Sequence, residues 1–246
     1  MTPQTDFLDS VSRRWLRSSF VLCLTSGLTL IGASLGIHGC GTSSKEPRPD
    51  RAEVAEISGS VEDLLSGSGA WKVAAAGDLM ETDGAIRTGS DGTAWLDLPG
   101  GGLSQVEASS RLEIREILKE DNQVDIWQTT LSMVRGSCFF SWTPGKGRFT
   151  VKTPHVTAAV LGTEFALSVT AEETRLIVAR GQVELTRDGE SVVVSRDQEA
   201  IAMEGRPIEP PRSVNPNQVE GLVGRLKTFQ EKREGLKLRR QTNTGG

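Results

Sequence analysis

The chain of 246 residues has 28 Lys and Arg against 32 Asp and Glu, a formal net charge of −4. This balance argues against nucleic acid as the main partner, since nucleic-acid-binding proteins usually carry a clear basic excess. With 27 glycines and 10 prolines, the composition indicates an ordered protein with many turns and excludes disorder throughout. Once a signal and a polar tail are set aside, about 160 residues remain, which fits one domain.

Residues 1–40 have the layout of an export signal. The uncharged stretch Phe20 to Ile37 follows Arg13, Arg14 and Arg17, and positive charge before an apolar stretch holds the N-terminus in the cytoplasm. We therefore expect the main domain on the extracytoplasmic, periplasmic side of a bacterial cell envelope. Ser12 to Leu16 is also similar to a twin-arginine export signal.

The end of the apolar stretch is similar to the lipobox of bacterial lipoproteins. In that interpretation Cys40 is the lipidated first residue of a membrane-anchored protein, and residues 41–52 form a flexible tether. His38 departs from the lipobox pattern, which normally has a small or aliphatic residue there. Two alternatives stay open: an uncleaved N-terminal anchor, for which roughly 18 apolar residues suffice, and ordinary cleavage near Ala33 or Gly39.

Residues 53–205 consist of brief apolar or alternating runs separated by turn residues, which is typical of an all-β domain. Strands are predicted at Glu53–Ile57, Val61–Leu65, Ala85–Thr88, Ala94–Leu98, Leu103–Val106, Arg111–Ile117, Gln123–Gln128, Leu131–Arg135, Cys138–Trp142, Arg148–Thr153, Val156–Leu161, Glu164–Val169, Arg175–Val178, Gln182–Thr186, Ser191–Val194 and Glu199–Met203. Asp188–Gly189 is the clearest hairpin turn, because both residue types tolerate a positive φ. The charges that alternate with aliphatic residues between Arg111 and Ile117 predict a solvated strand face.

Several short sequence segments in this region resemble motifs of the FecR family. In chain order they are Trp71 with Ala76–Leu79 and Gly84–Gly89, then Ser90–Leu98, Leu131–Ser137, Phe149–His155, Ala159–Phe165 and Val178–Val183. Their order and spacing agree with the family. Read physically, Gly162 and Gly181 allow tight bends or close backbone approach, while Phe149, Phe165 and Val183 supply apolar side chains to a core.

The FecR domain is a periplasmic all-β module, so the resemblance implies an envelope location and a β-roll or solenoid-like stack; periodicity alone would permit a sandwich. The best-known members are inner-membrane regulators with a cytoplasmic anti-sigma segment and a periplasmic domain that receives a signal from an outer-membrane transporter. Here only about 19 residues precede the apolar stretch, too few to fold around a sigma factor. What the resemblance implies is therefore the fold, the location and an expectation of partner binding.

The C-terminal region replaces the mixed α/β subdomain of those regulators. Residues 206–216 form a Pro-rich linker, and residues 217–240 form a predicted basic amphipathic helix. Its apolar residues at three- and four-residue spacing are Val219, Leu222, Val223, Leu226, Phe229 and Leu236, and its basic residues are Arg225, Lys227, Lys232, Arg233, Lys237, Arg239 and Arg240. Such a helix either docks its apolar stripe on the β-domain or lies on an anionic membrane or polymer.

The sequence contains none of the common catalytic or metal-binding motifs. His155 follows Thr153 and Pro154 in a predicted strand, where a structural role is expected. Cys138 lies in the apolar run before Phe139 and Phe140 and is expected to be a small buried hydrophobe. We predict a protein that is not an enzyme, with no cofactor and no metal site.

The leading hypothesis is a protein-binding, scaffold or signal-sensing module whose partner is another envelope protein. A polysaccharide- or peptidoglycan-binding module is the first alternative, in which Trp71, Trp95, Trp127 and Trp142 would stack on sugars. Exposure separates these two hypotheses, because glycan binding requires two or more solvent-facing rings on one face. A second alternative is an accessory part of a transmembrane sigma/anti-sigma signalling system. Cys40, as a lipidation site, is the only specific site residue predicted.

Overall fold

The computed structural model describes residues 51–119, 126–215, 217–221, 224, 227, 228 and 231. Two sheets, A and B, lie face to face and share strand β9 (Trp127–Ser141). In spatial order, sheet A contains β4 (Leu79–Met80), β1 (Ala52–Ser58), β6 (Thr93–Leu98), β7 (Gly102–Val106), β9, β12 (Glu164–Val169), β13 (Glu173–Arg180), β16 (Gln198–Met203) and β17 (Arg212–Ser213). Sheet B contains β3 (Trp71–Val73), β2 (Val61–Leu64), β5 (Ala85–Thr88), β8 (Arg111–Lys119), β9, β10 (Gly147–Lys152), β11 (Thr157–Val160), β14 (Gln182–Arg187) and β15 (Glu190–Ser195).

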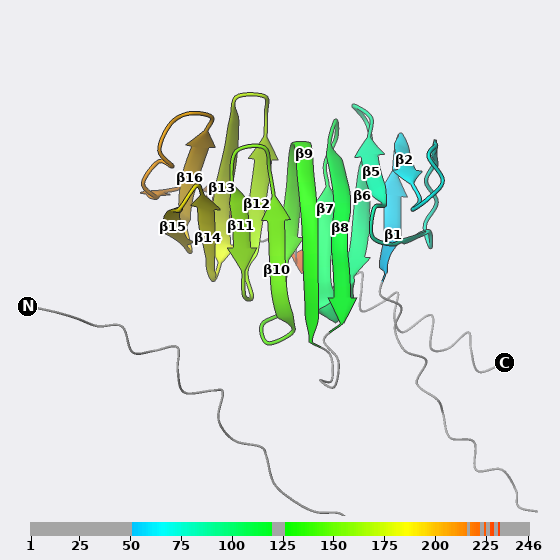
Figure 1. Ribbon diagram of the computed structural model, residues 1–246, viewed down its shortest axis with the longest axis horizontal. Helices are drawn as coiled ribbons and strands as arrows, with labels where there is room; N and C mark the ends of the chain where they lie inside the picture. Colours follow the sequence, from blue (N-terminus) through cyan, green and yellow to red (C-terminus); the bar gives the residue numbers. More distant parts are fainter. Residues whose placement is uncertain are drawn as a thin grey trace, which may run out of the picture. The chain divides into compact units, whose positions relative to one another are not determined.

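This arrangement confirms the predicted all-β class. Of the architectures that the sequence left open, it is the β-sandwich. Figure 1 shows the two layers, with β8, β10 and β11 in front of β7 and β12. Within the described residues all strand pairs are antiparallel except β9 with β10. A short 3-10 turn, η1 (Pro99–Gly101), joins β6 to β7.

Strand β9 belongs to both sheets. Its residues 127–135 pair with β8 and β10 in sheet B, and residues 136–141 pair with β7 and β12 in sheet A. The chain crosses between the layers at Gly136, where φ is +92° and a Cβ atom would lie 2.2 Å from Ser110 Oγ. Only glycine fits that position.

The sequence prediction of separate strands at Leu131–Arg135 and Cys138–Trp142 is therefore wrong. They are parts of one strand, because Gly136 bends the chain without interrupting its pairing. Most of the predicted strand Gln123–Gln128 lies outside the described residues. Strands β3, β4 and β17, each of two or three residues, were not predicted.

The core lies between the sheets and is filled by alternate residues of both. At its centre four aromatic rings from the two layers meet: Phe140 packs 5.1 Å from Phe165 and 5.7 Å from Phe149, and Trp142 stacks 4.9 Å from Phe149, measured between ring centroids. Phe149, Phe165 and Val183 are buried, which confirms their predicted role. Aromatic contacts across the interior tie the sheets together.

After β16 the chain continues along the edge of sheet A. Ile208 is buried in the main core, the Glu209 amide donates to the Ile201 carbonyl at 2.9 Å, and β17 then pairs with β16. The predicted C-terminal helix is present, and its described residues lie between 217 and 231. The apolar stretch predicted as a signal or anchor lies outside the described residues, and among the residues described no helix is long and apolar enough to cross a membrane.

Candidate binding surface

A groove of about 830 Å³ lies on the outer face of sheet B. Its residues come from β10, β11, β14 and β15, from the turn after β11 and from the turn before β14: Arg148, Thr150, Thr157, Ala159, Val160, Leu161, Gly162, Thr163, Gly181, Gln182, Glu184 and Val193. We call this surface the sheet B groove. Four strands that span about 45 residues of sequence meet there because β10, β11, β14 and β15 are neighbours in the sheet.

One end of the groove is shaped by a corner in which two turns touch. The Thr163 hydroxyl donates to the Gln182 carbonyl at 2.8 Å, and a Cβ atom on Gly181 would lie 2.7 Å from the Gly162 carbonyl oxygen. Gly162 itself has a φ of +138°. The expectation that both glycines permit close backbone approach is thus confirmed.

The groove combines exposed apolar side chains with few charges. Leu161 is 75% exposed and Val193 is 52% exposed. Arg148 and Glu184 are the only ionisable side chains in its lining, and Glu184 accepts a hydrogen bond from the Ser191 hydroxyl at 2.5 Å. Exposed aliphatic groups framed by hydroxyls and amides can bury apolar area against a partner and form hydrogen bonds at the rim.

The outer face of sheet A is covered over the same half of the domain. Val214 and Val219 of the C-terminal region pack with Ala179 and Ile177 of β13, and Val219 is only 7% exposed. Of the two predicted fates of the helix, docking on the β-domain is therefore realised at its first turn. We call the described residues 208–219 the C-terminal segment.

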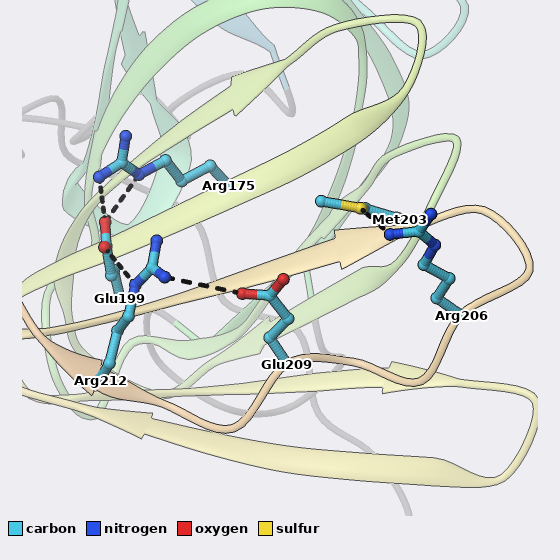
Figure 2. Close-up of polar contacts among 6 residues, drawn as sticks. All are labelled: Arg175, Glu199, Met203, Arg206, Glu209 and Arg212. Carbon is cyan, nitrogen blue, oxygen red and sulfur yellow. Dashed lines mark hydrogen bonds and ion pairs between the residues drawn. The ribbon is translucent and has the colours of Figure 1, made fainter.

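A network of ion pairs holds this segment in place (Figure 2). Glu199 of β16 accepts hydrogen bonds from Arg175 Nε at 2.7 Å and from Arg212 Nε at 2.8 Å, and Arg212 also lies 4.0 Å from Glu209. Burial acts to raise the pKa of Glu199, but the hydrogen bonds from Arg212 and Arg175 outweigh it, so the pKa lies below its ordinary value. Glu199 is therefore a buried anion that joins two strands of sheet A to the C-terminal segment.

The predicted tryptophan sites do not form a stacking platform. Trp127 and Trp142 are buried in the core. Trp71 and Trp95 are half-buried and lie in different sheets, on β3 and β6. The Trp71 ring is also covered by Arg87, whose guanidinium carbon lies 4.3 Å from the ring centroid. These positions leave the protein-partner hypothesis ahead of the glycan hypothesis by the exposure criterion.

His155 and Cys138 are both buried among groups that give them a structural role. His155 is buried, with Nδ1 2.9 Å from Thr174 Oγ1 and Nε2 3.3 Å from the Ala171 carbonyl oxygen. Cys138 is buried, and burial raises the pKa of its thiol, which keeps it protonated. In the described ranges no three His, Cys, Asp or Glu side chains gather to hold a metal ion. Cys40 lies outside the described residues.

Sequence reasoning missed a buried carboxylate at the other end of the domain. Asp63 of β2 is fully buried, and no described group donates a hydrogen bond to its oxygens; Lys72 Nζ lies 3.6 Å away. Burial raises the pKa of Asp63, while a hydrogen bond from Lys72 lowers that of Asp78. This cluster fastens the short strand β3 to β2, and Lys72 already occupies the position a cation would take.

Comparison with known proteins identifies a family over the middle of the chain. Residues 84–184 match the family described as FecR protein. Two crystal structures of a candidate anti-sigma factor from Parabacteroides distasonis, at 1.65 Å and 2.50 Å resolution, are similar to this chain at 19% identity and a TM-score of 0.46. The similarity covers 56% of this chain and 64% or 63% of those chains, less than two thirds of their length. No curated protein matches.

Proposed function

Residues 84–184 of this chain match the FecR family, and from that premise we propose that the protein is a non-enzymatic accessory of envelope signalling that binds another protein through the sheet B groove. The FecR match supports a signalling-related role. In this proposal the β-domain is exported to the periplasmic side and held at the membrane through lipidated Cys40. The bound partner is another envelope protein.

The observation that carries the proposal is the exposed apolar surface of the groove. Leu161 and Val193 remain in solvent, although the same chain covers the apolar residues of β13 on sheet A. Aliphatic groups left open on a rigid sheet indicate a surface that is completed by a partner. Its lining comes from four neighbouring strands and the turns beside them, a surface across which a polypeptide could lie.

The lining of the groove also supports a binding role rather than a catalytic one. Its two ionisable residues, Arg148 and Glu184, come with hydroxyls, amides and aliphatic groups but no histidine or cysteine. Acid–base or nucleophilic catalysis usually relies on a titratable base placed beside a nucleophile. The same groups serve well as hydrogen-bonding partners around an apolar contact.

Site-specific photo-cross-linking in intact cells tests the proposal. A benzophenone amino acid replaces Leu161 in the groove or, as a matched control, Val73, which is 79% exposed on the far edge of sheet B. We expect a discrete adduct with a second envelope protein at Leu161 and none at Val73. Absence of an adduct at Leu161, or equal adducts at both positions, would contradict the proposal.

A further inference from the structure

Strand β15 is an open edge of sheet B. It pairs with β14 on one side, and no other strand pairing among the described residues includes β15, since β16 pairs with β13 and β17. The other sheet edges are β3, β4 and β17, of three, two and two residues, whereas β15 has six. Very short edge strands resist pairing with another chain, and a long edge invites it.

The hairpin before β15 fixes which of its backbone groups point outward. Asp188 and Gly189 both have positive φ, and Arg187 pairs directly with Glu190 across the turn. In a two-residue hairpin of this kind the flanking pair is hydrogen-bonded, and hydrogen-bonded pairs alternate from there along the ladder. The amide and carbonyl groups of Ser191, Val193 and Ser195 therefore face away from β14.

Among the described residues, one of these three outward amides has a hydrogen-bond partner. The Ser195 amide donates to Gln198 Oε1 at 2.9 Å. Val193 combines an outward backbone with a side chain that is 52% exposed. The centre of the edge thus offers unpaired hydrogen-bonding groups together with an apolar side chain, which are the two components of recognition by strand addition.

The sequence of this edge is complementary to itself. Residues 190–196 read Glu-Ser-Val-Val-Val-Ser-Arg, so an antiparallel copy centred on Val193 sets valine against valine, serine against serine and Glu190 against Arg196. Opposite charges and β-branched pairs across strands are stabilising. Within its own chain Glu190 accepts a hydrogen bond from the Ile208 amide at 2.9 Å and lies 3.8 Å from Arg187, so the valine and serine pairs carry most of the complementarity. Arg196 is 72% exposed in its side chain and lies 3.2 Å from Asp197 of its own chain, so its guanidinium remains accessible to a second carboxylate.

We propose that β15 pairs antiparallel with β15 of a second copy of this chain, with Val193 on the twofold axis. Val193 exchanges two backbone hydrogen bonds with its counterpart, and the Ser191 amide donates to the Ser195 carbonyl of the other copy. The interface is isologous, as in most homodimers. Sheet B then continues across the axis and brings two sheet B grooves side by side. This inference is separate from the proposed function, although the two share Val193 at the rim of the sheet B groove.

Disulfide cross-linking of the full chain in membranes gives the first test. Antiparallel hydrogen-bonded residues have Cα atoms about 5.5 Å apart, within the range that a disulfide spans. Val193→Cys is expected to give a covalent dimer upon oxidation, whereas Val73→Cys, on the short edge strand β3, leaves only the background from the native cysteines. Equal dimer yields from both variants, or cross-linking of Val193→Cys to a different protein, would overturn the proposal.

Charge complementation gives the second test and identifies the partner as a second copy. Two differently tagged chains are co-expressed and one is pulled down from detergent extract. Val193→Lys paired with itself, or Val193→Glu paired with itself, is expected to reduce association by at least about tenfold, because like charges face each other. The Lys variant with the Glu variant should restore it. Undiminished self-association of Val193→Lys would exclude this interface.

The two proposals fail in different ways. Arg196 lies outside the groove lining and its side chain is 72% exposed, so Arg196→Glu, which sets two acidic side chains against each other across the axis, should fold normally, weaken the dimer and retain the photo-adduct at Leu161. Loss of the dimer with retention of the adduct separates self-pairing from binding in the groove.

Discussion

The C-terminal half of the β-domain has two outer faces. The chain's own C-terminal segment covers one of them, and the other is exposed. On sheet A, Val214 and Val219 cover the apolar residues of β13, and Glu199 fixes the covering segment through two arginines. On sheet B, Leu161 and Val193 stay exposed beside β11 and β14. The contrast separates apolar surface that serves folding within one chain from apolar surface that remains available to a partner.

The largest effect is expected at the ion pairs that hold the covered face. Glu199→Gln leaves Arg175 and Arg212 without their buried counter-ion, so we expect a loss of about 2 kcal/mol in the free energy of unfolding. Urea unfolding measures that loss, and faster tryptic cleavage at Arg206 or Arg212 reports release of the segment. Glu184→Gln, the same change on the open face, should stay within about 0.5 kcal/mol. Equal effects of the two variants would remove the contrast.

A smaller effect is expected from the apolar contact itself. Val219→Asp places a carboxylate against Ala179 and Ile177, and we expect a loss of about 1.5 kcal/mol from the lost burial. Hydrogen exchange should increase in β13 but not in β11. Leu161→Asp provides the control, since that side chain already lies in solvent and its change should leave unfolding unaltered. Protection of β13 that survives Val219→Asp would show that the helix contributes nothing to covering the face.

The smallest effect is a dependence of the covered face on pH. The folded-state pKa of Glu199 is lowered from the ordinary value of 4.5, so its contribution to stability is present above pH 4.5 and is lost as the pH falls through the folded pKa. We expect a protease active in acid to reach the C-terminal segment more readily below that point. In Glu199→Gln this step should vanish, and a step of the same size in that variant would assign it to another group.

Much of the fold could be predicted from local pattern. Short apolar or alternating runs predicted most of the long strands, and Phe149 and Phe165 were expected to supply apolar side chains to the core, where they lie. The two-residue strands β4 and β17 could not be found this way, since their pairing comes from neighbours far away in sequence. The continuity of β9 could not be predicted because glycine usually interrupts a strand. Here Gly136 lies within the strand, at the point where the chain passes from sheet B to sheet A.

The candidate surface was less predictable than the fold. Gly162 and Gly181 were singled out from the sequence, and they do meet at one end of the groove. Nothing local indicated that Leu161 and Val193 share a face, because the strand order that joins them is decided by pairing across the sheet. The sequence also could not decide whether the C-terminal helix docks on the β-domain or binds a membrane, because the same apolar stripe would suit either contact.

The place of β9 at the middle of both layers has a consequence for biogenesis. Strands β7 and β8 need β9 to satisfy their inner edges, and so do β10 and β12. A chain emerging from the N-terminus therefore displays two adjacent unpaired edges until residue 141 is available, and the two halves must then fold as one cooperative unit. During this interval the two edges are open to pairing with other chains.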